Sequence, residues 1–156
     1  VAALIPACDD GGPYHIAPED DDGLLEWPEA YQDFITEVGG ARFVKVDGDY
    51  APFFEKGKAF YEQRRGQLDL ACKHCHEDFE GGQLRANILS QGQGNGFPVY
   101  RLKWSGVGSL HRRFRGCNKQ VRSKPYGYGS DEYLALELYV MWRGRGLPVE
   151  TPAVRN

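Results

Sequence analysis

Two thiols and two imidazoles lie within five consecutive residues of this 156-residue chain, Cys72-Lys73-His74-Cys75-His76. The spacing is C-x-x-C-H, in which two thiols on neighbouring turns of a short helix can each add to one vinyl group of a haem. The histidine after the second thiol is then held under the iron as its proximal ligand. The pattern predicts one covalently bound haem c, attached through Cys72 and Cys75 and ligated by His76.

The same thiols could instead bind zinc or form a thioredoxin-like redox pair. A zinc site of this kind needs two further ligands at comparable spacing. The sequence contains no second C-x-x-C and no H-x-x-x-H. We therefore favour haem over both alternatives.

Two helical patterns flank the motif. The first begins at Pro52, which suits the first turn of a helix, and runs to about Arg65. The second follows Ser130, a good N-cap residue, has acids in its first turn and ends at Gly144 or Gly146. Both patterns predict helices that contribute to the core.

The first helix carries a small residue, Gly57, followed by an aromatic, Phe60. The small residue would let another helix approach closely, and the aromatic ring would pack beside the crossing. A helix of this kind before the haem motif resembles the first helix of class I cytochromes c. The resemblance implies a mainly α fold, with a class I cytochrome c-like haem domain over residues 51–156.

Charge is strongly segregated although the formal net charge is only −3. Residues 1–50 hold twelve acids and two bases, with runs rich in Asp, Gly and Pro, which predicts an irregular acidic N-terminal arm or linker. Residues 101–130 hold eight bases and no acid, and we expect them to form a basic loop. This segregation indicates docking of the arm on the loop, an anionic ligand, or both.

No nucleic-acid-binding motif accompanies the basic residues, and some of them would only neutralise the haem propionates, so no nucleic-acid partner is predicted. No apolar run is long enough to span a membrane. Haem attachment of this type takes place outside the cytoplasm, which predicts a periplasmic location in a bacterium. Cys8 follows a faint lipoprotein-like box, and a disulfide, a lipid anchor and a free thiol all stay open for it.

The residue that binds the distal side of the iron distinguishes a haem that only transfers electrons from one that takes part in a catalysed reaction. An electron carrier usually offers a Met thioether, but the one methionine, Met141, lies inside the second predicted helix, where we expect it to pack in the core. The other candidates are His111 and Cys117. Arginines flank Cys117 and favour its thiolate, an anionic iron ligand that lowers the reduction potential. We predict Cys117 as the distal ligand, with His111 as the alternative.

Three segments together, Arg64–Leu68, Cys72–His76 and Arg112–Asn118, resemble the SoxA family. SoxA is the catalytic subunit of the SoxAX cytochrome complex, L-cysteine S-thiosulfotransferase, of bacterial sulfur oxidation. The resemblance covers roughly residues 27 to 150. Its specificity rests on the combination, because C-x-x-C-H alone is common to all c-type cytochromes.

The resemblance implies roles for particular residues. In the family the active-site haem is ligated by a histidine and a modified cysteine, a persulfide, which correspond to His76 and Cys117. An arginine four residues before that cysteine lines the active site, and Arg113 occupies this position. Cys117 and Arg113 are thus the expected catalytic residues. The candidate substrate-binding residues are Arg112, Arg115 and His111.

The reaction implied is the oxidative joining of thiosulfate to a cysteine of the SoxY carrier in SoxYZ. Electrons would pass through haem to the SoxX partner subunit or to a small cytochrome c. A pocket of arginines would attract and hold the thiosulfate dianion. Many SoxA proteins have an additional N-terminal cytochrome domain, whereas residues 1–50 contain no second C-x-x-C-H. We therefore expect one haem, in a monohaem member or one that has lost an upstream domain.

Two other functions are compatible with the sequence. A simple periplasmic electron-transfer cytochrome would use Cys117 only to tune the potential of a His/Cys-ligated haem. A sensor or binding subunit would hold an anion in its arginine-rich segment without turning it over.

Overall fold

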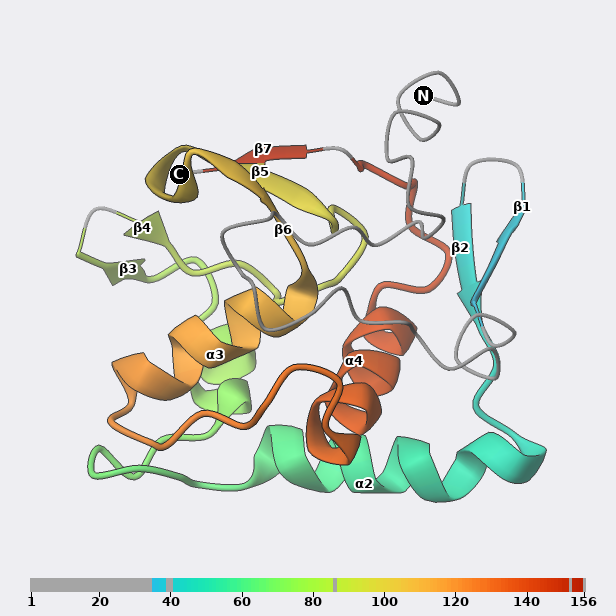
Figure 1. The fold of residues 1–156 in the computed structure, drawn as a ribbon, viewed down its shortest axis with the longest axis horizontal. Coiled ribbons are helices and arrows are strands. Elements are labelled where there is room, and N and C mark those ends of the chain that lie inside the picture. Colours follow the sequence, from blue (N-terminus) through green and yellow to red (C-terminus); the bar gives the residue numbers. More distant parts are fainter. Residues whose placement is uncertain (1–34, 39–40, 86, 152, 156) are drawn as a thin grey trace.

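The computed structural model describes residues 35–38, 41–85, 87–151 and 153–155 of the chain (Figure 1). Most of the predicted acidic arm, Cys8 included, lies outside these ranges. Three helices form the centre of the described part. They are α2 (Ala51–Glu62), α3 (Leu110–Gln120) and α4 (Asp131–Arg143).

Helices α2 and α4 are the two helices predicted from the sequence. Pro52 lies in the first turn of α2, and the Ser130 hydroxyl accepts a hydrogen bond from the Tyr133 backbone N–H at 3.4 Å to cap α4. Gly144 follows the last turn of α4 as its C-cap. Helix α2 ends at Glu62, before the predicted Arg65, because the next residue turns to an extended backbone.

The two helices cross (Figure 1), and Gly57 lies at their closest contact. A Cβ atom at this position would lie 1.9 Å from the carbonyl oxygen of Ala135, so only glycine permits so close a crossing. Phe60 is buried one turn further along α2. Around the crossing the ring centres of Tyr61 and Tyr139 lie 5.2 Å apart in the shared core. The predicted roles of Gly57 and Phe60 are confirmed.

The basic segment is not the loop that the sequence suggested, because it contains α3. Ser109 caps this helix by accepting a hydrogen bond from the Arg112 backbone N–H at 3.2 Å. Leu110, Phe114 and Asn118 are buried and recur every four residues, so one face of an otherwise polar helix packs on the core. The low apolar content of this segment therefore did not indicate that it forms a helix.

The haem motif lies in one irregular helical stretch. Cys72 and Lys73 begin a turn that widens into a π-helix, η3 (His74–Asp78). The Glu77 carboxylate lies 2.9 Å from the guanidinium of Arg143 at the end of α4. This ion pair joins the motif to the C-terminal helix.

Short strands surround the helices and were not predicted. An antiparallel hairpin precedes α2, a second follows the haem motif, and a three-stranded sheet has the order β6-β5-β7, with β5 antiparallel to β6 and parallel to β7. The mainly α prediction holds for the core only. The strands are β1 (Ile35–Val38), β2 (Ala41–Val44), β3 (Gln83–Leu84), β4 (Asn87–Ile88), β5 (Val99–Arg101), β6 (Gly106–Gly108) and β7 (Ala153–Arg155), and the 3-10 turns are η2 (Gly48–Tyr50) and η4 (Leu102–Trp104).

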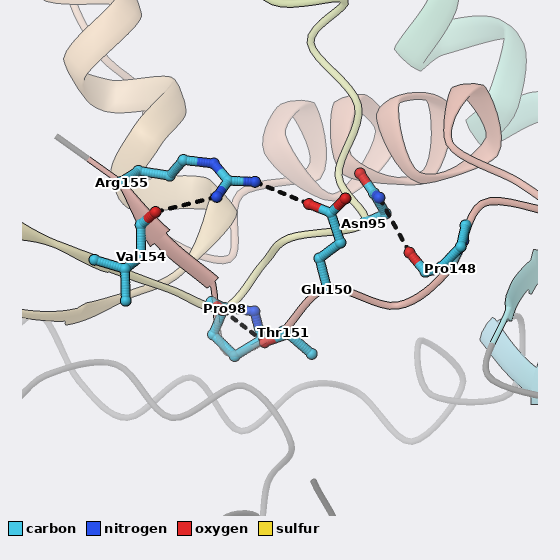
Figure 2. A network of polar contacts seen from close by, with 7 residues as sticks. All are labelled: Asn95, Pro98, Pro148, Glu150, Thr151, Val154 and Arg155. Atoms are coloured by element: carbon cyan, nitrogen blue, oxygen red, sulfur yellow. Dashed lines mark hydrogen bonds and ion pairs between the residues drawn. The ribbon is translucent and has the colours of Figure 1, made fainter.

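The segment that leads from α4 to β7 is tied to the loop before β5 (Figure 2). The Asn95 amide donates a hydrogen bond to the Pro148 carbonyl at 3.1 Å, and the Thr151 hydroxyl donates one to the Pro98 carbonyl at 2.6 Å. Figure 2 shows the Asn95–Pro148 contact beside the Glu150–Arg155 ion pair and the Thr151–Pro98 contact below that pair. The Arg155 guanidinium and the Glu150 carboxylate are 2.8 Å apart. No helix among the described residues has the length and apolar character to cross a membrane.

Candidate functional site

A cavity of about 1100 Å³, part of it open to solvent, lies between the haem motif and the three helices. Cys72, Cys75 and His76 line it from the motif, and Arg113 and Cys117 line it from α3. Five of the residues singled out by sequence therefore share one cavity. Much of the remaining lining is apolar and comprises Phe60, Leu70, Leu84, Leu89, Phe97, Leu110, Phe114, Leu136 and Val140.

His76 is held in one orientation by its neighbours. Its Nδ1 atom donates a hydrogen bond to the Ser90 carbonyl at 2.7 Å, which leaves Nε2 as the nitrogen that can bind a metal. Gly92 has a φ of +67°, and a Cβ there would lie 2.6 Å from Cγ of the His76 ring. Burial acts to lower the pKa of His76, but contact with Cys117 and the bond to Ser90 outweigh burial and raise it.

The charges around Cys117 favour its thiolate. Burial acts to raise the pKa of this thiol, but a hydrogen bond with His76 and the positive charges of Arg113 and Arg101 outweigh burial and lower it. Burial instead raises the pKa of Cys72 to about 12, and it also raises that of Cys75. The same cavity thus holds one thiol favoured as an anion and two favoured as neutral thiols.

These residues fit a covalently attached haem. Cys72 and Cys75 are free of disulfides and line a largely apolar cavity, as thioether attachment requires. The glycine at position 92 leaves room for the oriented ring of His76, which would be the proximal ligand. Cys117 lies within hydrogen-bonding reach of that ring and would occupy the distal position. The donor set of an imidazole and a thiolate is a ligand pair that haem iron accepts.

The chain is 56% identical over 110 residues to the L-cysteine S-thiosulfotransferase subunit SoxA of Pseudaminobacter salicylatoxidans, which covers 70% of this chain and 38% of the relative. It is 52% identical over 142 residues to the SoxA subunit of Paracoccus pantotrophus, covering 86% of this chain and 49% of the relative. In a crystal structure of SoxXA from P. pantotrophus, a chain with 52% identity matches this fold with a TM-score of 0.73, over 76% of this chain and 45% of that chain.

Over this shared part, the chain belongs to the SoxA family. No protein-family model matches the sequence. The chain spans less than half the length of the SoxA subunits described above. The family resemblance predicted from three short segments is confirmed.

Among the predicted residues of this SoxA chain, His111 is not brought to the cavity. Its side chain is fully buried between α3 and α4, where Nε2 lies 2.8 Å from the Glu137 carboxylate. The Gly129 backbone N–H donates to Nδ1 at 3.1 Å. Both ring nitrogens are therefore engaged in the core, which leaves neither for iron or substrate. Its assignment as an alternative distal ligand or a substrate-binding residue does not fit this geometry.

The three arginines of this SoxA helix have different surroundings. Arg113 lines the cavity with Cys117, since residues four apart share one face of a helix. The Arg112 guanidinium lies 4.5 Å from the ring centre of Trp104, and that of Arg115 lies 4.7 Å from the ring centre of Tyr128. Neither of these two residues lines the cavity. The structure therefore brings only one of the three arginines to the site.

Sequence reasoning missed several residues that shape the site. Arg101, at the end of β5, is close enough to Cys117 for its charge to lower the pKa of that thiol. The Ser90 carbonyl orients His76 through a backbone atom, which leaves no pattern in the sequence, and the missing Cβ of Gly92 leaves room for the ring. Arg65 lines the cavity from the segment after α2. Met141 is buried in α4 and is not part of the lining, as the core-packing prediction required.

Proposed function

We propose that this chain is the haem-bearing part of an L-cysteine S-thiosulfotransferase, which joins thiosulfate to a cysteine of the SoxY carrier in SoxYZ. The observation that carries the proposal is the joint placement of Cys117 and Arg113 in the cavity of the haem motif. A lowered pKa makes Cys117 a nucleophile, and Arg113 supplies positive charge for a dianion. The names of the SoxA relatives point to the same reaction.

The chemistry requires one S–S bond and the removal of two electrons. The Cys117 thiolate forms a bond with the sulfane sulfur of thiosulfate, giving a Cys117 S-thiosulfonate and releasing two electrons. The thiolate of the carrier cysteine then attacks the sulfane sulfur, takes the thiosulfonate group and releases the Cys117 thiolate. The proton lost by the carrier thiol goes to solvent. A persulfide at Cys117 would perform the same exchange through its terminal sulfur.

Each residue has a distinct part in this sequence. Arg113 binds the sulfonate oxygens and holds the sulfane sulfur toward Cys117. Cys72 and Cys75 would attach one haem c, and His76, oriented by the Ser90 carbonyl, would hold its iron. Bound haem would supply a one-electron acceptor that passes electrons onward. Cys117 would also be available to the iron, so the same sulfur would serve both as a ligand and as the nucleophile.

The partners follow from the same assignment. The structural match to a chain of SoxXA supports SoxX as the partner subunit, and electrons would pass to it or to a small cytochrome c. We place the haem domain at residues 51–156, preceded by the acidic arm over residues 1–50. Haem attachment through C-x-x-C-H is consistent with a periplasmic location.

Replacing Cys117 with Ser tests this function in the haem-loaded complex with SoxX and SoxYZ. Thiosulfate-dependent reduction of cytochrome c should be abolished while the haem stays attached, because the haem thioethers do not involve Cys117. Lys119→Met, at an exposed position of the same helix, is the control and should keep full turnover. Unchanged thiosulfate-dependent turnover in Cys117→Ser would contradict this function. Rapid electron exchange with a small cytochrome c, without any thiosulfate chemistry in the unmodified protein, would favour the simple electron carrier instead.

A further inference from the structure

Arg64 and Arg65 are adjacent in sequence but differ in their surroundings. Arg64 is exposed, and its Nε atom donates to the Asp69 carboxylate at 2.9 Å. Arg65 lines the cavity, and its Nη1 atom is buried with no hydrogen-bond partner within the described part of the chain. A buried guanidinium nitrogen without an acceptor is costly, so such an atom implies an acceptor that binds there.

The guanidinium of Arg65 is fixed in place by two aromatic rings. It lies 4.6 Å from the ring centre of Phe60 and 4.7 Å from that of Tyr126, and the two rings are 5.7 Å apart. Cation–π contacts of this kind hold the plane of the guanidinium without using its N–H donors. The arginine is therefore oriented while at least one donor stays available.

The backbone of Arg65 is fixed as well. Its N–H donates to the Leu70 carbonyl at 3.1 Å, and the Leu70 N–H donates back to the Arg65 carbonyl at 3.2 Å. The next residue, Gly66, has a φ of +69°, and a Cβ there would lie 2.1 Å from the Val121 carbonyl oxygen at the end of α3. This close approach anchors the segment on the helix that carries Cys117.

Tyr61 is a second lining residue of the same cavity with a buried polar group. The Tyr61 hydroxyl is buried and has no hydrogen-bond partner among the residues that the structure describes. A guanidinium and a phenol in one largely apolar cavity form a donor set suited to an oxyanion. Low polarity around them would strengthen each charge-assisted hydrogen bond.

We propose that Arg65, assisted by the Tyr61 hydroxyl, binds an oxyanion inside this cavity. Two groups have the required chemistry, a propionate carboxylate of the haem and the sulfonate end of thiosulfate. The first source needs only bound haem, whereas the second rests on the proposed function. Arg65 lies outside the basic segment, so it adds a cation from a different part of the chain.

The test compares Arg65→Met with Arg64→Met, an exposed control of the same type, in haem-loaded protein. If the oxyanion is a propionate, Arg65→Met shifts the propionate bending band in the resonance Raman spectrum and lowers the reduction potential, with thiosulfate affinity unchanged. If it is the sulfonate, thiosulfate binding, followed by optical titration, weakens roughly tenfold or more while the Raman band stays in place. Turnover of Cys117→Ser tests the proposed function, whereas the Raman band and the thiosulfate affinity test the oxyanion site at Arg65. Either proposal can therefore be contradicted without the other.

The proposal is overturned if Arg65→Met loads haem normally and neither the Raman band nor thiosulfate affinity changes. It is also overturned if Arg64→Met produces the same changes. Should Arg65→Met fail to fold, Tyr61→Phe removes only a hydroxyl and should move the same readout in the same direction by a smaller amount. An unchanged Raman band and unchanged thiosulfate affinity in Tyr61→Phe would then contradict the proposal.

Discussion

The Nε2 atom of His111 lies 2.8 Å from the carboxylate of Glu137, and both side chains are buried. Because the Gly129 N–H donates to Nδ1, the imidazole hydrogen lies on Nε2, directed at the carboxylate. The pair joins α3, which carries Cys117, to α4. The pair holds α3 in position against α4, although neither His111 nor Glu137 lines the cavity.

Breaking this pair should destabilise the protein strongly. Removing the carboxylate leaves the buried Nε2–H of His111 without its acceptor, and we expect Glu137→Ala to lower the free energy of unfolding by about 2–3 kcal/mol. Denaturant unfolding of the haem-loaded protein measures this loss. Glu150→Ala breaks an exposed pair with Arg155 and should change stability by about 1 kcal/mol or less. Equal effects of the two variants would contradict the structural role of Glu137.

The helix crossing predicts the effect of one added methyl group. Gly57→Ala would place a Cβ against the Ala135 carbonyl and force α2 from α4, with a loss of about 1–3 kcal/mol in unfolding free energy. Thermal unfolding of the haem-loaded protein measures it. Gly127→Ala is the control, because nothing lies within 4 Å of its Cβ position. A Gly57→Ala protein as stable as Gly127→Ala would show that the helices are not in such close contact.

Gly92 offers a test of how the proximal histidine is held. Gly92→Ala combines a positive φ with a Cβ pressed on the His76 ring, so the ring must tilt or the loop must move. We expect a changed EPR spectrum of the oxidised haem. Gly81→Ala shares the positive φ but meets nothing within 4 Å, and its spectrum should match that of the unmodified protein. Identical spectra for both variants would show that the loop at Gly92 does not hold the His76 ring.

Two buried tyrosines predict how stability depends on alkaline pH. Burial raises the pKa of Tyr133 and of Tyr139 above the ordinary value of 10.0. Since the folded pKa exceeds the unfolded one, their contribution is full below pH 10.0 and is lost as pH rises through the raised folded values. We expect Tyr139→Phe to move the midpoint of alkaline unfolding upward, as followed by phenolate absorbance. Tyr100→Phe on the outer sheet is the control, and an equal shift there would contradict this assignment.

The sequence predicted two helices, α2 and α4, from local chemical markers. Pro52 and Ser130 marked the starts of α2 and α4, and Gly57 marked their crossing. The strands β5 and β6 were missed because each has three residues, too few for an alternating pattern to be recognised.

Only part of the site was predicted, because some of its contacts leave no marker in the sequence. Arg113 was assigned to the surroundings of Cys117 through the family resemblance, and both residues line the cavity because a spacing of four residues places them on one helical face. Arg112 and Arg115 were grouped with it while the segment was taken as a loop, and the helix turns both away from the cavity. The role of Ser90 comes from a backbone carbonyl that no residue type reveals. The pairing of His111 with Glu137 could not be predicted either, because it depends on how α3 packs against α4.

In the proposed reaction, Cys117 is the sulfur that accepts thiosulfate. Peptide mass analysis tests this role directly, after the haem-loaded protein is incubated with thiosulfate and oxidised cytochrome c without SoxYZ. We expect one thiosulfonate group on Cys117 and two molecules of cytochrome c reduced for each group added. An unmodified Cys117 in protein that turns over fully when SoxYZ is supplied would contradict it.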